Sequence, residues 1–152
     1  MARANDTATI HCPSAQPAAD AVVFGVVTGP PADRRIGYLT EPQPATESIL
    51  ALVGPATPGQ VFRMAAPCMG DTCKHFDAGA CSLVKRVVAS FDPVVGSLPP
   101  CRIRPACRWF RQEGRDACLR CPQVVTDNFD PTELQRLVAD AEADGPDSLR
   151  IG

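Results

Sequence analysis

The sequence CRIRPACRWFRQEGRDACLRC, residues 101–121, places four cysteines and six arginines within 21 residues. A shorter stretch before it, CMGDTCKHFDAGAC at residues 68–81, adds three more cysteines, so seven of the eight cysteines lie within 54 residues. The chain of 152 residues also carries 16 prolines and only 5% aromatic residues. A chain of this composition buries a modest apolar core, and we expect metal at the cysteines to complete the fold.

The compartment decides how clustered cysteines are interpreted. The residues after Met1 are polar, which argues against a secretory signal, and no run of about 18 apolar residues predicts a membrane span. The sequence therefore predicts a cytoplasmic protein that does not enter a membrane. In a reducing compartment clustered cysteines are typically metal ligands, and a disulfide framework is the lesser alternative that an even count of eight leaves open.

Seven cysteines and one histidine supply eight candidate metal ligands, a number that suits two sites of four. The candidates are Cys68, Cys73, Cys81 and His75 for one site, and Cys101, Cys107, Cys118 and Cys121 for the other. A single site on four of the seven cysteines is the alternative. His75 has a second interpretation, as a turn residue hydrogen-bonded to Asp77. Cys12 lies far away in the sequence and is expected to be a free thiol, with completing a site as the alternative.

The spacing of the cysteines favours an iron–sulfur cluster, such as 4Fe–4S, over zinc. Zinc ribbons and fingers present closely paired cysteines, and here only Cys118 and Cys121 are two residues apart. Irregular spacing is accommodated more readily by loops that wrap a larger group, and prolines beside Cys68, Cys101 and Cys121 resemble the proline that ends ferredoxin motifs. One or two zinc ions remain the alternative. A redox-active pair at 118–121 is disfavoured, because no strand precedes it in the required place.

The cysteine-rich centre is basic and the end of the chain is acidic. Residues 63–121 carry ten Lys and Arg against five Asp and Glu, and residues 122–152 carry two against seven. This pattern predicts an acidic protein as partner, with nucleic acid as the alternative. The candidate partner-binding residues are Arg102, Arg104, Arg108, Trp109 and Arg111. Arginines near a cluster would instead offset thiolate charge, and the aromatic residues can equally fill the core.

The order of predicted elements indicates an α+β fold, a small metal-organised cysteine-rich domain with an N-terminal β-hairpin and short helices. We predict a flexible leader at 1–20, a hairpin and short-helix segment at 21–63, a metal-binding module at 64–126, and a C-terminal helix with an acidic tail at 127–152. The hairpin strands are expected at 21–28 and 34–39.

Capping signals place the expected helices. Thr46 begins a helix that ends at Gly54, Ser82 begins one over 83–89, and a third covers 108–118 despite Gly114. The last is expected over 130–144 with Asp130 as its N-cap. Residues 57–64 fit either a helix start or an extended segment.

Residues 61–126 carry several motifs that can be compared with known families. They include APC at 66–68, CKHF at 73–76, LPPCRIR at 98–104, CRWF at 107–110 and ACLRCPQVVT at 117–126. In these motifs the chain resembles a group of uncharacterised bacterial cysteine-rich proteins loosely labelled nitrogen-fixation proteins. The resemblance implies a bacterial metal-binding accessory protein that carries iron–sulfur, and it assigns no ligand individually.

The sequence thus predicts a metal-binding accessory protein with an iron–sulfur cluster on the Cys68–Cys121 set, acting as an electron-transfer or assembly partner. The alternative is a zinc-stabilised module that binds nucleic acid or protein. No phosphate-binding loop, Ser/His/acid set or His-Glu-x-x-His motif is present, which disfavours a self-contained hydrolase. A cluster-carrying subunit of an enzyme remains a third interpretation.

Overall fold

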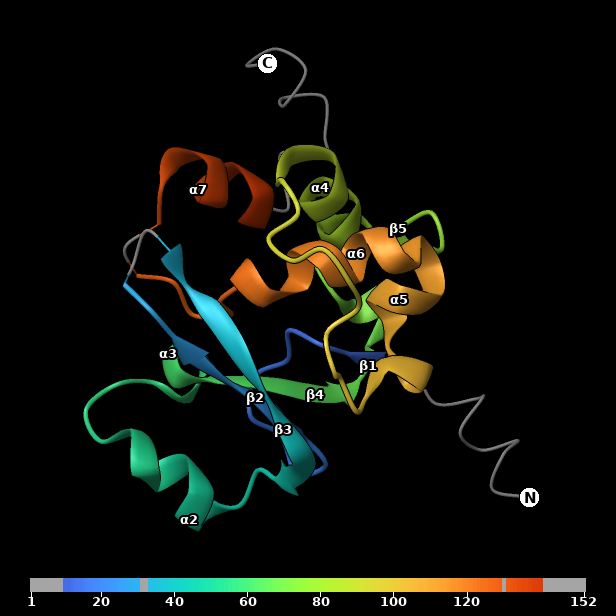
Figure 1. Cartoon of the computed structure of the whole chain (residues 1–152). Helices are drawn as coiled ribbons and strands as arrows, with labels where there is room; N and C mark the ends of the chain where they lie inside the picture. Colours follow the sequence, from blue (N-terminus) through green and yellow to red (C-terminus); the bar gives the residue numbers. More distant parts are fainter. Residues whose placement is uncertain (1–9, 31–32, 130, 141–152) are drawn as a thin grey trace.

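A four-stranded antiparallel sheet and a group of helices beside it make up the computed structural model, which describes residues 10–30, 33–129 and 131–140 (Figure 1). The sheet has the order β1-β4-β2-β3, with β1 (His11–Cys12), β2 (Val22–Thr28), β3 (Arg35–Pro44) and β4 (Phe62–Pro67). A second, two-stranded sheet pairs β5 (Phe76–Asp77) with β6 (Ala80–Cys81). The predicted α+β class and the N-terminal hairpin are confirmed.

Short helices occupy most of the second half of the chain. The α-helices are α2 (Glu47–Leu50), α3 (Pro58–Val61), α4 (Ser82–Ser90), α5 (Arg108–Glu113), α6 (Arg115–Arg120) and α7 (Glu133–Ala139). The 3-10 turns are η2 (Ala51–Val53), η3 (Gly70–Thr72), η4 (Arg104–Ala106) and η5 (Cys121–Gln123). None of the helices in the described ranges is long and apolar enough to cross a membrane.

The hairpin of β2 and β3 follows from a β-branched apolar run and the turn after it. Its register pairs Thr28 with Arg35, and an irregularity falls between Val23 and Gly25. Gly25 is required at that point, because a Cβ there would stand 2.4 Å from Cγ2 of Ile36. A larger residue would push the two strands apart.

Strand β4 ties the N-terminal segment to the cysteine-rich segment. It pairs with β2 on one side and with β1 on the other, so the boundary expected at residues 63/64 lies inside a strand. Of the two alternatives for residues 57–64, both are used: Thr57 is the N-cap of α3, and the extended segment begins at Phe62.

Part of the expected leader has a defined place in the sheet. His11 and Cys12 form β1, which pairs with Pro67 and Ala66 of β4. The amide of Cys68 also donates to the carbonyl of Ile10 at 2.7 Å. Residues 1–9 lie outside the described residues. The pairing brings Cys12, which we expected far from the other cysteines, beside Cys68.

The helices were predicted with mixed success. Thr46 caps α2, accepting from the amide of Ile49 at 3.3 Å, as predicted. The helix predicted over 108–118 is two helices, because Gly114 turns the chain with φ +70 and ψ −149. The last helix is shorter than predicted and its N-cap is Thr132, whose side chain accepts from the amide of Gln135. Asp130 and residues 141–144 lie outside the described residues.

Two apolar clusters hold the molecule together. Val23 of β2 and Phe62 and Met64 of β4 form the first cluster, and residues of α2 pack against it. The second lies between α4, α5, α6 and α7, which gather on one side of the sheet in Figure 1. It contains Trp109, which is 1% exposed, together with the cysteines Cys81 and Cys107. Cysteines therefore belong to the core, and groups bound at them would stabilise the packing of the helices.

Candidate metal centres

Four cysteines from four separate segments line one cleft of about 1050 Å³. They are Cys12 at the end of β1, Cys68 after β4, Cys73 after η3 and Cys81 at the end of β6, here called the first thiol set. The pKa of Cys12 is raised from 9.0 to about 11, mainly by burial and in smaller part by the charges of Cys81, Cys68 and Cys73. The four thiols are therefore electrostatic neighbours.

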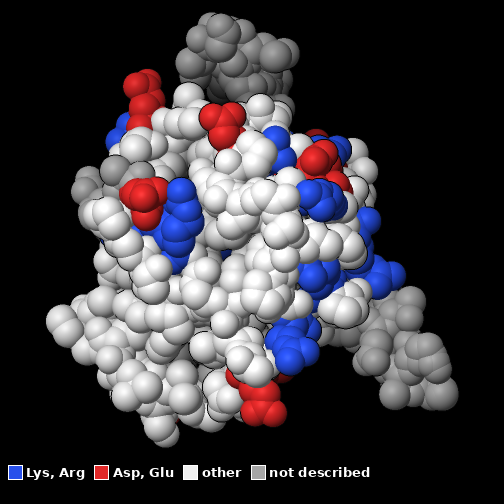
Figure 2. All heavy atoms as spheres, viewed as in Figure 1, with Lys and Arg blue, Asp and Glu red and all other residues white. Residues whose placement is uncertain are grey.

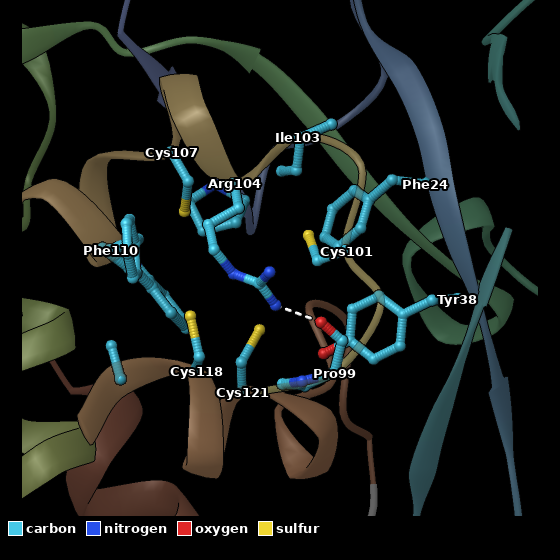
Figure 3. A pocket seen from close by; sticks show the side chains of 13 residues that line it. Phe24, Tyr38, Pro99, Cys101, Ile103, Arg104, Cys107, Phe110, Cys118 and Cys121 are labelled. Atoms are coloured by element: carbon cyan, nitrogen blue, oxygen red, sulfur yellow. Dashed lines mark hydrogen bonds between the residues drawn. The ribbon is translucent and has the colours of Figure 1, made fainter. Parts of the chain in front are cut away.

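The other four cysteines line a second pocket, of about 20 Å³, shown in Figure 3. They are Cys101 before η4, Cys107 before α5, Cys118 in α6 and Cys121 at the start of η5, here called the second thiol set. Burial is the main cause that raises the pKa of Cys101 to about 11 and of Cys107 to about 12. These values keep both thiols protonated near neutral pH unless a metal displaces the proton.

The guanidinium of Arg104 lies among the sulfurs of the second thiol set (Figure 3). It hydrogen-bonds Cys118, which lowers the pKa of that thiol against the larger raising effect of burial. Its Nη2 also donates to the carbonyl of Pro99.

Backbone amides donate to several of the sulfurs. The thiol of Cys12 accepts from Ser14 and that of Cys101 from Ile103, and the amide of His75 stands 3.5 Å from Sγ of Cys73. Cys81 and Cys107 are the N-cap residues of α4 and α5, and the amides of the first helical turn lower the pKa of each thiol against the larger raising effect of burial. Such donors stabilise a thiolate far more than a neutral thiol.

Arg63 is a fully buried cation that touches the second thiol set. Its Nη2 stands 3.1 Å from Sγ of Cys121, and its Nη1 donates to the carbonyls of Cys121 and Val124, both at 2.9 Å. Its exposed fraction is 0%, and its guanidinium carbon lies over the rings of Phe24 and Trp109. Burial works to lower the pKa of Arg63, but the charges of Cys121 and Tyr38 and the hydrogen bond to Cys121 together outweigh it, so the pKa is raised.

Tyr38 provides a further donor to the same sulfur. Burial is the main cause that raises its pKa, followed by the charge of Cys121, and the hydroxyl hydrogen-bonds that sulfur. A sulfur that receives both a guanidinium and a phenol is built to carry negative charge. Neither Arg63 nor Tyr38 was singled out from the sequence, because both belong to strands and lie far along the chain from Cys121, the cysteine that they contact.

His75 lines the cleft of the first thiol set, and its ring is held by Arg86. Nη2 of Arg86 stands 2.9 Å from Nδ1 of His75. Because arginine only donates, Nδ1 accepts, and a neutral imidazole then carries its proton on Nε2. His75 is thus arranged to donate from Nε2, whereas a metal ligand needs a free lone pair there.

Four buried polar atoms near the thiol sets have no hydrogen-bond partner in the described part of the chain. They are Nδ1 of His11, Nε of Arg104, Nε of Arg108 and Nε1 of Trp109. Trp109 lines both pockets, Arg104 lines the second and Arg108 lines the first. Buried donors without acceptors are costly, and an anionic group at the thiols would supply acceptors.

The side-chain types of the two thiol sets suit a bound metal–thiolate group, whereas their present geometry does not hold one. Among residues 10–30, 33–129 and 131–140, no three Cys, His, Asp or Glu side chains converge closely enough to hold one ion as they stand. A group bound at the second thiol set would also require the Arg104 side chain to swing out of the pocket. The donor set itself, thiols with amide and arginine partners, matches the chemistry of such a group.

The predicted partner-binding residues divide by exposure. Arg102 and Arg111 are exposed, and Figure 2 shows lysines and arginines gathered on the flank where Figure 1 has α5 and α6. Arg108 is half-buried over the ring of Phe76 at 5.2 Å, and Arg104 points into the second pocket. The prediction for Trp109 is wrong, because its ring is buried in the helical core.

The comparisons with known proteins leave the chain without an assigned relative. No family model matches it, no curated protein matches it, and no solved structure matches it. The resemblance drawn from the motifs at 66–126 therefore stays a prediction.

Cys12 is the candidate site residue that the sequence undervalued. Its distance along the chain hid a partnership that the β1–β4 pairing creates. One local signal was available: Cys12 precedes Pro13, as Cys121 precedes Pro122, and prolines also flank Cys68 and Cys101. A proline beside a cysteine fixes the backbone at the ligand, so the shared neighbour pointed to a shared role.

Proposed function

We propose that this chain holds two iron–sulfur clusters of the 4Fe–4S type, one on each thiol set. In this proposal the chain acts in the cytoplasm as the electron-transfer or assembly partner of another protein. The observation that carries the proposal is the division of eight cysteines into two sets of four, each lining its own pocket. Four thiolates are the ligand number of a 4Fe–4S cluster. Its chemistry would be to accept and release one electron at a time.

Cys12, rather than His75, is proposed as the fourth ligand of the first thiol set. Cys12 shares the cleft with the other three cysteines and interacts electrostatically with each of them. The hydrogen bond from Arg86 to Nδ1 of His75 favours a proton on Nε2. His75 would then donate a hydrogen bond toward the bound group, in a supporting role.

The donors around the sulfurs support a group with net negative charge. Cys121 accepts from both Arg63 and Tyr38, and five other cysteines have backbone amides at their sulfurs. Hydrogen bonds to cluster sulfurs set the reduction potential of iron–sulfur proteins. The same bonds would be of less use to an uncharged thiol, which is a weak acceptor.

Zinc is the second candidate, because four cysteines also make a structural zinc site. Around one zinc ion at about 2.3 Å, four sulfurs stand about 3.8 Å apart. In the second thiol set the guanidinium of Arg104 lies among the sulfurs (Figure 3). The irregular spacing of the cysteines in sequence favours the larger cluster over a single zinc ion.

An acidic protein is the proposed partner. Arg102 and Arg111 are exposed beside the second thiol set, and their flank is basic in Figure 2. Charges of one sign around a redox site steer a partner of opposite sign to it. The role agrees with the bacterial accessory proteins that the motifs resemble. If the metal is zinc, the same arginines would serve nucleic acid or another protein instead.

The test is to remove each thiol set separately and count the metal left. Two double variants, Cys68→Ser with Cys73→Ser and Cys101→Ser with Cys118→Ser, are purified without oxygen and analysed for iron, sulfide and zinc. Each is expected to keep about half of the wild-type iron and sulfide, since a 4Fe–4S cluster has four cysteine ligands. Each variant is the control for the other, and circular dichroism checks folding. Full wild-type iron in either variant, or zinc in place of iron, would contradict the proposal.

A further inference from the structure

We propose that the large cleft of this chain binds an amphipathic organic anion, a molecule with an anionic head and an unbranched apolar chain. The cleft of about 1050 Å³ is lined by α4, α5 and α7 together with residues 14–18 and 72–76. Pockets of roughly 300 to 1000 Å³ with an apolar lining and a few polar groups are typical of small-molecule sites. The inference goes beyond the proposed function and does not require a metal.

The cleft has an apolar floor that extends along α4. Leu83 near the start of the helix and Phe91 directly after its end both line the cleft, and eight residues of helix span about 12 Å. Leu83 and Val124 are half-buried and pack against the helical core, so they present apolar surface to the cleft. Helix α7, which lies beside α4 in Figure 1, adds Val138 to the lining. An elongated apolar chain fits this floor.

The segment 14–18 forms a wall of the cleft that is fixed by long-range hydrogen bonds. Oγ of Ser14 stands 3.1 Å from Oγ1 of Thr126, and Nε2 of Gln16 donates to Oδ1 of Asp127 at 2.8 Å. These bonds join positions 112 and 111 residues apart in the chain. A wall tied down in this way keeps the cleft formed in the absence of a ligand, and a preformed site lowers the cost of binding.

Positive charge predominates among the residues that line the cleft. Lys74, Arg108 and Arg136 line it, against Asp20 as the one acidic residue of the described lining. Lys74 and Arg136 are exposed and Arg108 is half-buried, with its guanidinium carbon 5.2 Å from the ring centroid of Phe76. An anionic head would complement these cations, whereas a neutral head would leave them unmatched. The charges and the apolar floor together indicate an amphipathic anion.

The experiment titrates the anaerobically purified chain with dodecanoate, at concentrations below micelle formation, and follows the fluorescence of Trp109. Trp109 is the single tryptophan of the chain and lines the cleft, so its emission reports on occupancy. Saturable binding of one dodecanoate is expected, and calorimetry checks the stoichiometry. Octanoate should bind at least tenfold more weakly, because its shorter chain buries fewer methylene groups. Dodecanol, which has the same chain without the charge, should also bind more weakly.

Two sets of variants separate the head from the chain. Lys74→Gln with Arg108→Gln should weaken dodecanoate binding about fivefold, because two cations of the lining are lost. Lys85→Gln with Arg115→Gln removes the same charge from exposed positions outside the lining and is the matched control, expected to change nothing. Leu83→Gln should reduce the difference in affinity between octanoate and dodecanoate.

Equal affinities for dodecanoate and dodecanol would overturn the anionic head, and equal affinities for octanoate and dodecanoate would overturn the apolar floor. No binding, or the same weakening in both double variants, would overturn the site itself. Circular dichroism checks folding, and if Lys74→Gln with Arg108→Gln does not fold, Lys74→Gln is compared with Lys85→Gln by the same criterion. Iron and sulfide are measured in the same samples, so that a failure of the iron–sulfur proposal is recorded separately from a failure to bind dodecanoate.

Discussion

Several cysteine sulfur atoms in this chain lie beside hydrogen-bond donors. The first amides of α5 lie near Cys107, and the sulfur of Cys121 accepts hydrogen bonds from Arg63 and Tyr38. These arrangements stabilise thiolates, yet burial raises the pKa values of Cys12, Cys101 and Cys107. The proposed metal would reconcile the two effects, because it would displace the proton and leave the donors to stabilise the charge.

The metal-free, reduced chain should lose stability as pH rises. The pKa of Cys12 is about 11 in the folded chain and 9.0 ordinarily, so its stability contribution is complete below pH 9 and is lost toward pH 11. That loss is on the order of 2 kcal/mol for Cys12 when fully ionised. Guanidinium titrations at pH 8, 9.5 and 11 measure it.

The control for the pH dependence is Cys12→Ser, which removes one titrating thiol and should give a shallower decline of the unfolding free energy over the same range. A stability that stays flat from pH 8 to 11 would show that the buried thiols do not titrate as their surroundings require.

Replacement of Cys12 and replacement of His75 should have different effects on the iron content. Cys12→Ser should reduce the iron of the first thiol set by half or more, because a hydroxyl is a poorer ligand for iron than a thiolate. His75→Ala should leave the iron content unchanged and alter the visible spectrum only slightly. Iron analysis of the two variants side by side measures this, and the reverse order of iron contents would assign the ligand to His75.

At the scale of elements, a single glycine sets the angle between two ligand-bearing helices. Gly114 has φ +70 and ψ −149, a conformation that is essentially confined to glycine. It ends α5, which begins after Cys107, and begins α6, which carries Cys118. The turn therefore positions two members of the second thiol set relative to each other.

Gly114→Ala should strain this turn and disturb the second thiol set. The expected cost is about 1–3 kcal/mol of unfolding free energy, together with lower iron at the second set and normal iron at the first. Gly96→Ala is the matched control, since nothing lies within 4 Å of a Cβ there and its φ is ordinary. Denaturant unfolding and iron analysis provide both readouts; equal results for the two variants would contradict a special role for the turn.

The predictable elements were those with local signals. The β-branched run of the hairpin and the Thr46 cap need only neighbouring residues, and both appear in the structure. The last helix was misjudged at its start because Thr132 and Asp130 are both good caps and only packing distinguishes them. Of the candidate site, the four cysteines of the second set lie within 21 residues, so their grouping could be read from spacing.

What the sequence could not supply was long-range. Cys12 joins the first thiol set through a pairing with residues 66 and 67, and such pairings leave no mark on local sequence. Arg63 is a buried cation on a strand, which pattern analysis assigns to solvent. Trp109 was assigned to a partner because aromatic and arginine residues lie close together there. In the structure its ring is buried in the helical core.

At the scale of the whole molecule, the sheet and the helices meet at the two thiol sets. Strands supply Cys12, Cys81 and the neighbourhood of Cys68. Helices and the turns beside them supply the other cysteines, and Arg63 reaches from β4 to η5. Charge is distributed unevenly over this frame, with the basic flank next to the second thiol set (Figure 2). A net charge of −2 therefore conceals a local site for anions.

The basic flank should retain the chain on a cation-exchange resin at low salt despite its net negative charge. Arg102→Ala with Arg111→Ala should elute at lower salt than wild type, because both side chains are exposed there. Arg35→Ala with Arg136→Ala removes the same charge from exposed or half-buried positions elsewhere and is the control. Elution of both double variants at the same salt would mean that the flank has no special affinity for anions.

The most direct test of the central claim is the metal content of the wild-type chain purified without oxygen. We predict a brown protein with broad visible absorption, about eight iron and eight sulfide per chain, and little zinc, as two 4Fe–4S clusters require. A colourless protein with two zinc ions and no sulfide would contradict the iron–sulfur proposal and make both thiol sets structural zinc sites.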